Sequence, residues 1–317
     1  FSLTKAQKNA IIDCVNDMNH GIMMNRLIQG DVGSGKTAVA AAVCYTAIKN
    51  GLQATMMAPT EILAEQHFAS FVKMFSKTGI QVALLTGSTT AKKRAEILSR
   101  LKEGDIDLIV GTHAIIQNDV EFNRLGLVIT DEQHRFGVNQ RAMLSSKGLN
   151  PHVMVMSATP IPRTLALMIY GDLDISILDE LPPGRQPIET FVINSKIRER
   201  AFGYIKKHLD EGRQGYIVCP LVSDENDDDN SNKIAAENYK NELSENQFKG
   251  YSVGLLHGKM KSSEKEDVMR KFASGQIQLL VSTTVIEVGV DVPNSVIMMI
   301  ENADLFGLSQ LHQLRGR

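Results

Sequence analysis

Short apolar runs rich in β-branched residues alternate along this chain with longer stretches of helical periodicity. Such runs, bounded by turn residues, are typical of buried strands. Strands are expected at Arg26–Gln29, Ala54–Ala58, Val82–Thr86, Leu108–Val110, Leu127–Thr130, Val153–Met156, Glu189–Ile193, Gly215–Cys219, Val253–His257, Gln278–Ser282 and Val296–Ile300. Helices are expected at Thr37–Lys49, Ile62–Phe75, Thr90–Leu101, Lys196–Glu211, Ala235–Leu243 and Ser262–Phe272. This alternation indicates βαβ units and mainly parallel sheets flanked by helices, an α/β fold.

The alternation is interrupted once, between Asp179 and Arg185, where two prolines and a glycine follow one another. These residues cannot continue a helix or a central strand. We therefore expect two α/β domains, residues 1–182 and 188–317, joined by a linker at 183–187. The chain has 317 residues, of which 43% are hydrophobic. It is therefore long enough to give each domain a core of its own.

Composition excludes some classes of protein. No apolar run approaches the length needed to span a bilayer, and the N-terminus does not resemble a signal peptide. The cysteines Cys14, Cys44 and Cys219 have no metal-ligand spacing and form no disulfide framework, and the latter is typical of a reducing cytosol. The chain begins without Met and stops at Arg317, so we expect a fragment of a longer protein.

The formal net charge is −2, which at first argues against a nucleic-acid partner. Residues 224–229 include five acidic side chains, however, and without them the balance would be positive. This run continues into Asn230, Ser231 and Asn232 and predicts a solvated, mobile loop rather than a metal site. A local basic groove elsewhere in the chain therefore stays possible.

The run from Gly30 to Thr37 matches a phosphate-binding loop. Its glycines allow successive backbone N–H groups to turn towards phosphates, and the helix that follows directs its positive end at the anion. Lys36 would place its charge on the β- and γ-phosphates, and the Thr37 hydroxyl would ligate Mg²⁺. We predict ATP with Mg²⁺ as the ligand. The residues expected at the loop are Gly30, Asp31, Gly33, Ser34, Gly35, Lys36 and Thr37.

Asp131 and Glu132 follow the apolar strand at 127–130. The carboxyl ends of parallel strands are where such sheets bind ligands. Asp131 would hold Mg²⁺, and Glu132 would orient and deprotonate the attacking water. Alone, this pair could be a strand running into a polar turn. The phosphate loop upstream favours the catalytic interpretation.

Further motifs follow in the order found in superfamily 2 helicases and translocases, which the chain resembles over nearly its whole length. Residues 131–134, Asp-Glu-Gln-His, resemble the DExH box of that family. The other matching segments are Phe1–Gln7, which precedes the loop, Ala58–His67 (motif Ia), Gly111–His113 (motif Ib), Ser157–Pro160 (motif III), Leu256–Met260 (motif IV), Ser282–Asp291 (motif V) and Gln310–Arg317 (motif VI).

This resemblance implies two tandem RecA-like domains with ATP between them and a role for each motif. Gln7 would recognise adenine, and Arg317 would stabilise charge on the transferring phosphoryl group. Gly289 and Asp291 would lie near the nucleotide. Residues expected to couple hydrolysis to movement are Gln133, His134, Ser157 and Thr159, and residues expected to hold the nucleic-acid backbone are Thr60, Thr112 and Thr283.

Four segments carry a closer resemblance: the phosphate loop and residues 131–138, 157–164 and 181–185. Their sequences resemble the RecG family of bacterial helicases, which remodel branched DNA in repair and recombination. The related Mfd family of duplex translocases usually has Phe in place of Ser34 and Glu in place of Gln133. The resemblance implies a monomeric motor on branched or duplex DNA in the bacterial cytoplasm. A wedge domain before the chain and a hairpin after it are expected in the longer protein.

Three alternatives stay open: an Mfd-like translocase, a superfamily 2 RNA helicase, and a phosphate-loop protein that acts as a switch or binding module. The Gln-His ending of the DExH box and the linker count against the RNA helicase. The complete set of second-domain motifs counts against the switch. Aromatic residues are scarce, at 5% with no Trp, so no stacking platform for single strands is evident. That favours contact with a duplex backbone.

Overall fold

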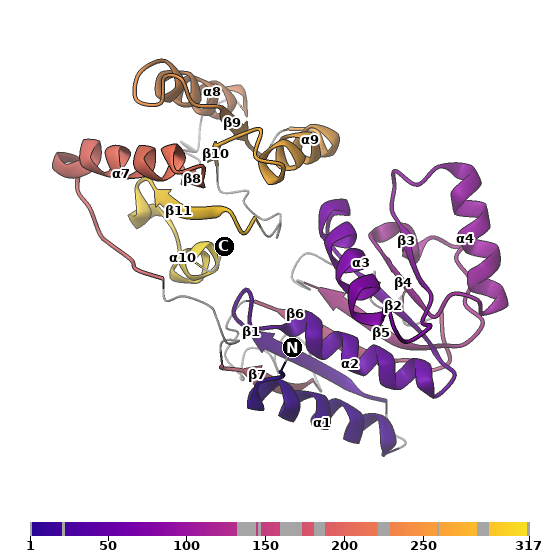
Figure 1. Ribbon diagram of the computed structural model, residues 1–317. Helices are drawn as coiled ribbons and strands as arrows, with labels where there is room; N and C mark the ends of the chain where they lie inside the picture. Colours follow the sequence, from indigo (N-terminus) through magenta and orange to yellow (C-terminus); the bar gives the residue numbers. More distant parts are fainter. Residues whose placement is uncertain are drawn as a thin grey trace. The chain divides into compact units, whose positions relative to one another are not determined.

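A computed structural model describes residues 2–20, 23–131, 144, 147–158, 173–180, 188–220, 229–258, 260–283 and 292–315. Contacts between Cα atoms divide the chain into two compact units, residues 1–185 and 186–315. Each unit contains one sheet flanked by helices (Figure 1). The two units are described separately.

The first unit is built on a parallel sheet of seven strands in the order β3-β4-β2-β5-β6-β1-β7. Its elements are α1 (Lys5–Asn19), β1 (Asn25–Gly30), α2 (Lys36–Lys49), β2 (Gln53–Met57), α3 (Glu61–Phe75), β3 (Val82–Leu85), α4 (Ala91–Glu103), β4 (Leu108–Gly111), η1 (His113–Ile116), β5 (Leu125–Asp131), β6 (His152–Ser157) and β7 (Asp174–Leu178).

Every residue of the central strands β2, β4 and β5 is buried, which explains why these strands are mostly apolar along their whole length. Met56 belongs to a core cluster with residues of α1, α2 and α3, whereas its neighbour Met57 belongs to a cluster with residues of α4 and η1. Successive side chains of a strand point to opposite faces, so one apolar run supplies both cores.

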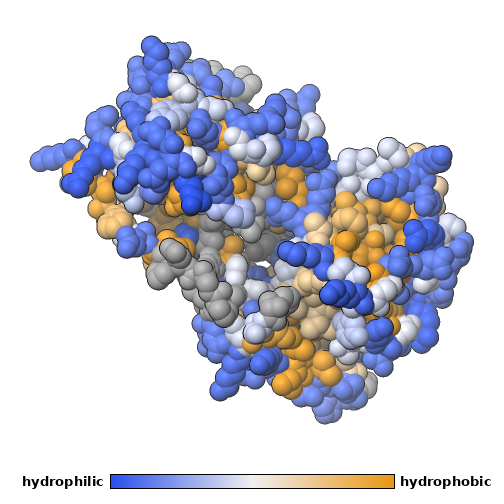
Figure 2. Space-filling view, in the orientation of Figure 1, coloured by the Kyte–Doolittle hydropathy of each residue, from blue (hydrophilic) through white to orange (hydrophobic). Residues whose placement is uncertain are grey.

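The second unit has a parallel sheet of four strands in the order β11-β8-β10-β9. Its elements are η3 (Ser195–Ile197), α7 (Arg198–Asp210), β8 (Gln214–Val218), α8 (Asp229–Glu245), β9 (Val253–Leu256), α9 (Ser262–Ala273), β10 (Leu279–Ser282), β11 (Ser295–Ile300), η4 (Ala303–Leu305) and α10 (Leu308–Arg315). Phe202 and Phe248 meet edge to face in its core, with ring centroids 5.5 Å apart. In the view of Figure 2, the surface over α8 and α9 is mostly hydrophilic.

The predicted α/β class with parallel sheets is confirmed, and so are all the expected strands except Glu189–Ile193. That segment forms neither a strand nor a helix. Its alternating apolar residues suit a strand, yet a strand needs a hydrogen-bonded neighbour, and none lies beside it in the described part of the chain. Phe191 and Val192 are instead 75% and 99% exposed. The prediction for this segment was therefore wrong for the described structure.

The expected loop at 224–232 was wrong for residues 229–232, because α8 begins at Asp229, and residues 224–228 lie outside the described residues. Asp, Asn and Ser are favoured at helix starts, so the polar residues 229–232 suit a first helical turn as well as a loop. The sequence patterns also missed α1, β7 and α10. Of these, α1 and β7 contribute to the environment of the phosphate loop.

Helix α1 begins at a capping box. The Gln7 N–H donates to Thr4 Oγ1, and the Thr4 N–H donates to Gln7 Oε1 at 3.0 Å. The Glu180 carboxylate, just beyond β7, accepts from the Lys5 and Ala6 N–H groups. A carboxylate at this position satisfies donors that the helix leaves unpaired and suits the positive end of the helix.

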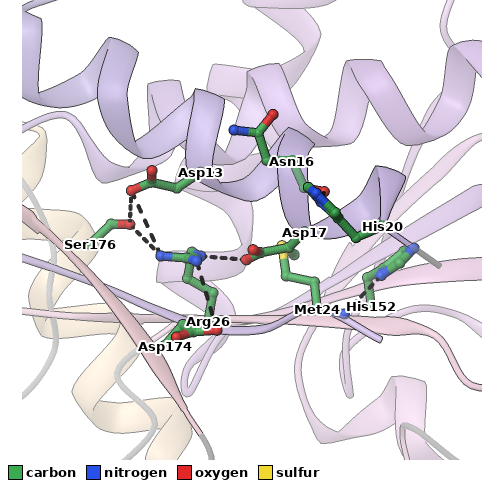
Figure 3. A network of polar contacts seen from close by, with 9 residues as sticks. All are labelled: Asp13, Asn16, Asp17, His20, Met24, Arg26, His152, Asp174 and Ser176. Carbon is green, nitrogen blue, oxygen red and sulfur yellow. Dashed lines mark hydrogen bonds and ion pairs between the residues drawn. The ribbon is translucent and has the colours of Figure 1, made fainter. Parts of the chain in front are cut away.

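Arg26 links β1 to α1 and to β7 (Figure 3). Its Nε donates to Asp17 Oδ2 at 2.6 Å, and its Nη1 donates to Ser176 Oγ at 2.9 Å. Asp13 and Asp174 lie slightly further away, at 3.7 and 3.8 Å from the guanidinium nitrogens. Burial opposes the charge of Arg26, but these carboxylates outweigh it, so the pKa of the guanidinium is raised. The network fixes the strand that leads into the phosphate loop.

Candidate functional site

The phosphate loop joins β1 to α2, and three of its glycines are required for two different reasons. Gly33 and Gly35 have φ angles of 76° and 86°, which residues with a Cβ rarely adopt. Gly30 is required for a different reason, because a side chain would not fit at this position. A Cβ there would lie 2.6 Å from Ser34 Oγ and 2.8 Å from Leu178 Cβ. The glycine spacing seen in the sequence therefore has a direct structural cause.

The polar atoms of the loop are arranged to receive an anion. The Lys36 Nζ donates to the carbonyl oxygens of Gly30 at 2.6 Å and Asp31 at 2.9 Å, so its ammonium lies over the loop. The buried Ser34 hydroxyl has no hydrogen-bond partner within the described ranges. Gly35 is the N-cap of α2, whose first turn carries Lys36 and Thr37. A helix N-terminus with an adjacent ammonium is suited to phosphate groups.

Gln7 is buried and connects α1 to the loop. Its Nε2 donates to the carbonyl oxygen of Ser34 at 2.9 Å, while its Oε1 accepts from Thr4. In this structure Gln7 therefore supports the loop backbone. Its expected role in adenine recognition stays a prediction.

Asp131 ends β5, and its buried carboxylate contacts a residue that the sequence did not single out for the site. The His67 Nε2 lies 2.7 Å from Asp131 Oδ2. His67 is on α3 among apolar residues that face the core. A polar residue on such a face was the available signal, because a buried imidazole needs a partner.

The sheet brings Asp131 and the loop to the same edge. Strand β6 lies between β5 and β1. Its last residue, Ser157, pairs with Gln29, the residue before Gly30, and Met156 pairs with Asp131. The loop, Ser157 and Asp131 thus lie at the carboxyl ends of neighbouring parallel strands.

The three threonines expected at nucleic acid are in two kinds of environment. Thr60 is the N-cap of α3 and accepts from the Leu63 N–H at 3.4 Å. Thr112 follows β4 and Thr283 follows β10, and both hydroxyls are buried without a hydrogen-bond partner among the described residues. Burying a hydroxyl without a partner costs free energy, so an external acceptor or donor would be favourable at each.

Seven residues predicted for the site lie outside the described residues, and the structure says nothing about their positions. They are Glu132, Gln133, His134, Thr159, Gly289, Asp291 and Arg317.

Within the described ranges, no helix is both long enough and apolar enough to cross a membrane.

Comparison with known families and proteins covers the whole chain. Residues 4–168 match the DEAD/DEAH box helicase family, and residues 200–317 match the helicase conserved C-terminal domain. The ATP-dependent DNA helicase RecG of Bacillus subtilis is 54% identical over 318 residues, which are 100% of this chain and 46% of that protein. RecG of Synechocystis is also 54% identical, over 100% of this chain and 38% of its own length. The chain therefore spans less than half the length of these curated relatives.

Solved structures are similar as well. A structure of RecG bound to a three-way DNA junction has 46% identity and a TM-score of 0.86, covering 100% of this chain and 41% of that one. Mss116p bound to single-stranded RNA and AMP-PNP has 18% identity and a TM-score of 0.71, covering 99% of this chain and 66% of that one, and shows the fold alone. The two units are RecA-like helicase domains, as the motif order predicted.

Proposed function

Because this chain belongs to the DEAD/DEAH box helicase family, we propose that it is the ATP-hydrolysing motor core of a bacterial DNA helicase that remodels branched DNA. Stalled forks and Holliday junctions in repair and recombination are the expected substrates. The observation that carries the proposal is the similarity to RecG over every part of the chain. The phosphate loop, Ser157 and Asp131, which lie at one edge of the sheet, would take part in ATP binding and hydrolysis. The likeness to RNA-bound helicases is limited to the fold, and among the described residues no feature of the site favours RNA.

The described residues fit ATP. The backbone N–H groups around Gly33 and Gly35 and the start of α2 would bind the phosphates, and Lys36 would neutralise the β- and γ-phosphate oxygens. Thr37 and Asp131 would hold Mg²⁺, which supplies positive charge to the phosphate oxygens. His67 would keep the Asp131 carboxylate oriented.

Residues outside the described ranges would complete hydrolysis. Glu132 would take the proton of the attacking water, and Arg317 would stabilise charge on the transferring phosphoryl group. Gly289 and Asp291 would lie near the nucleotide, and Gln7 would recognise adenine. The residues proposed to couple hydrolysis to movement are Gln133, His134, Ser157 and Thr159.

DNA would be held mainly through its phosphate backbone. Thr60, Thr112 and Thr283 would contact phosphate oxygens, which fix register without distinguishing bases. The place of each threonine within its motif is what supports this, and the hydroxyls of Thr112 and Thr283 are buried in the described structure. We expect the motor to act as a monomer in the bacterial cytoplasm.

ATP hydrolysis measured with no nucleic acid, single-stranded DNA, branched duplex DNA and RNA tests the proposal. Branched DNA should stimulate turnover most. Lys36→Ala should abolish turnover, because the phosphates lose their main point charge. Lys49→Ala is the matched control, since Lys49 is exposed at the other end of the same helix. Strongest stimulation by RNA would refute the DNA motor, and unchanged turnover in Lys36→Ala would refute the assignment of the site.

A further inference from the structure

The sheet of the second domain repeats part of the first. The order β11-β8-β10-β9 corresponds to β5-β2-β4-β3, with the same connections along the chain. The pairing of β5 with β2 shifts register directly after Gln53, and the pairing of β11 with β8 shifts directly after Gln214. Two sheets that share order, direction and an irregularity can be compared residue by residue.

Two buried glutamines confirm this correspondence. The Gln53 Nε2 donates to the carbonyl oxygens of Leu101 and Ile106, both at 2.8 Å. The Gln214 Nε2 donates to those of Phe272 at 2.6 Å and Ile277 at 2.7 Å. Each glutamine begins its strand and contacts the end of the helix that precedes the neighbouring strand. Gln214 is therefore the counterpart of Gln53.

The correspondence identifies the second domain's counterparts of the two proposed Mg²⁺ ligands. Met57 pairs with Thr130, and Val218 pairs with Ile300, so Glu301 corresponds to Asp131. Arg198 precedes Gln214 by the same number of residues as Thr37 precedes Gln53. Both lie in the first turn of the helix before the strand. The second domain thus has an arginine and a glutamate where the first has a threonine and an aspartate.

These two residues contact each other directly and share a third partner. The Arg198 Nε and Nη2 donate to Glu301 Oε1 at 3.1 and 2.8 Å. The Tyr239 hydroxyl donates to the same oxygen at 2.8 Å and accepts from Arg198 Nη2 at 2.9 Å. Burial raises the pKa of Tyr239, so the phenol stays neutral and keeps its proton for Glu301. Arg198 also lies over the Phe202 ring, with its guanidinium carbon 5.1 Å from the centroid.

Glu301 is the point where β11 ends and the segment towards motif VI begins. Its N–H donates to the carbonyl oxygen of Val218 at 2.8 Å. Asn302 follows in the left-handed region, with a φ of 47°, and turns the chain into η4 and α10. Leu314 of α10 is buried near the end of that helix. The orientation of this segment therefore depends on how firmly Glu301 is held.

We propose that the Arg198 guanidinium is a cation supplied by the chain itself at the second domain's counterpart of the proposed Mg²⁺ site, taking the place that Mg²⁺ would have in the first. Glu301 and Tyr239 are then positioning residues, which fix the start of the segment 302–315 that leads to Arg317. The catalytic consequence, an effect of these residues on ATP hydrolysis, rests on the proposed function, because it requires Arg317 to act on ATP. The structural consequence, an effect on the stability of the segment 302–315, does not rest on it.

DNA-stimulated ATP hydrolysis in Glu301→Gln and Arg198→Met tests the catalytic consequence. A misplaced arginine affects the transition state more than ATP binding, so kcat should fall by roughly tenfold with the KM for ATP within about twofold. Arg198→Lys keeps a cation and should recover much of the loss. Asp267→Asn is the control, because Asp267 forms an exposed ion pair on α9 of the same domain. An unchanged kcat in both charge variants would overturn the positioning role.

Hydrogen exchange of the same variants tests the structural consequence whether or not the protein hydrolyses ATP. Exchange should accelerate in 301–315, with protection of β8 and β10 retained. Equal loss of protection over the whole second domain would show a general stabilising role and overturn the proposal, as would unchanged exchange in 301–315. A wild-type protein without DNA-stimulated turnover would instead count against the proposed function.

Discussion

Replacing Arg26 by Met removes the central cation of the network that connects α1, β1 and β7, while keeping most of the apolar stem. The Arg26 side chain is 11% exposed, and that of Asp17, its closest partner, is 24% exposed. Asp13 and Asp174 are 46% and 72% exposed, so water can solvate their carboxylates once the guanidinium is removed.

The cost of this substitution comes mainly from Asp17. Removing one partner of a fully buried ion pair costs about 3–5 kcal/mol. Because Asp17 keeps some contact with water, we expect Arg26→Met to lower the free energy of unfolding of the first domain by about 2–3 kcal/mol. Arg26→Lys keeps the charge but loses the planar fork of donors, and should cost about 1 kcal/mol. Asp174→Asn, at 3.8 Å and largely exposed, should cost about 0–0.5 kcal/mol.

Hydrogen exchange of the α1 and β1 amides at increasing urea concentration measures the stability of the first domain separately from the second. Far-ultraviolet circular dichroism follows the overall transition, since the chain has no Trp for fluorescence. Less than about 1 kcal/mol lost in Arg26→Met would refute the reasoning from burial. So would an Asp174→Asn variant as unstable as Arg26→Met.

Two further predictions concern buried polar groups. Thr112→Val and Thr283→Val remove hydroxyls that have no partner in the described structure, so stability should stay unchanged or rise by about 1 kcal/mol while DNA stimulation of ATP hydrolysis falls. Loss of stability without loss of stimulation would contradict the proposed DNA contacts. Burial raises the pKa of the Cys44 thiol, and that of the Cys14 thiol to about 12. The thiolate is the reactive form, so iodoacetamide at pH 8 should label both cysteines in urea but hardly in the native protein. Mass spectrometry that finds equal labelling in both conditions would refute their burial.

The conformation of the phosphate loop was predictable because its signal is local. The glycine spacing from Gly30 to Gly35 depends on backbone angles and on space within the loop itself. Asp131 was predictable because an apolar run that ends in an acid places it at the carboxyl end of a strand, where the structure has it. The same kind of local pattern also misled: the alternation at Glu189–Ile193 suits a strand, but pairing depends on a neighbour that the pattern does not specify.

The sequence by itself determined the α/β class, the place of the phosphate loop between a strand and a helix, and the order of the motifs. Each of these follows from residues close together in the chain. Only the tertiary structure decided that His67 contacts Asp131, that Gln7 supports Ser34, and that the second domain carries an arginine and a glutamate at the counterparts of Thr37 and Asp131. These contacts join residues that are distant in sequence. The packing of helices on parallel sheets brings them together, and no local pattern of hydrophobic and polar positions records which side chains will meet.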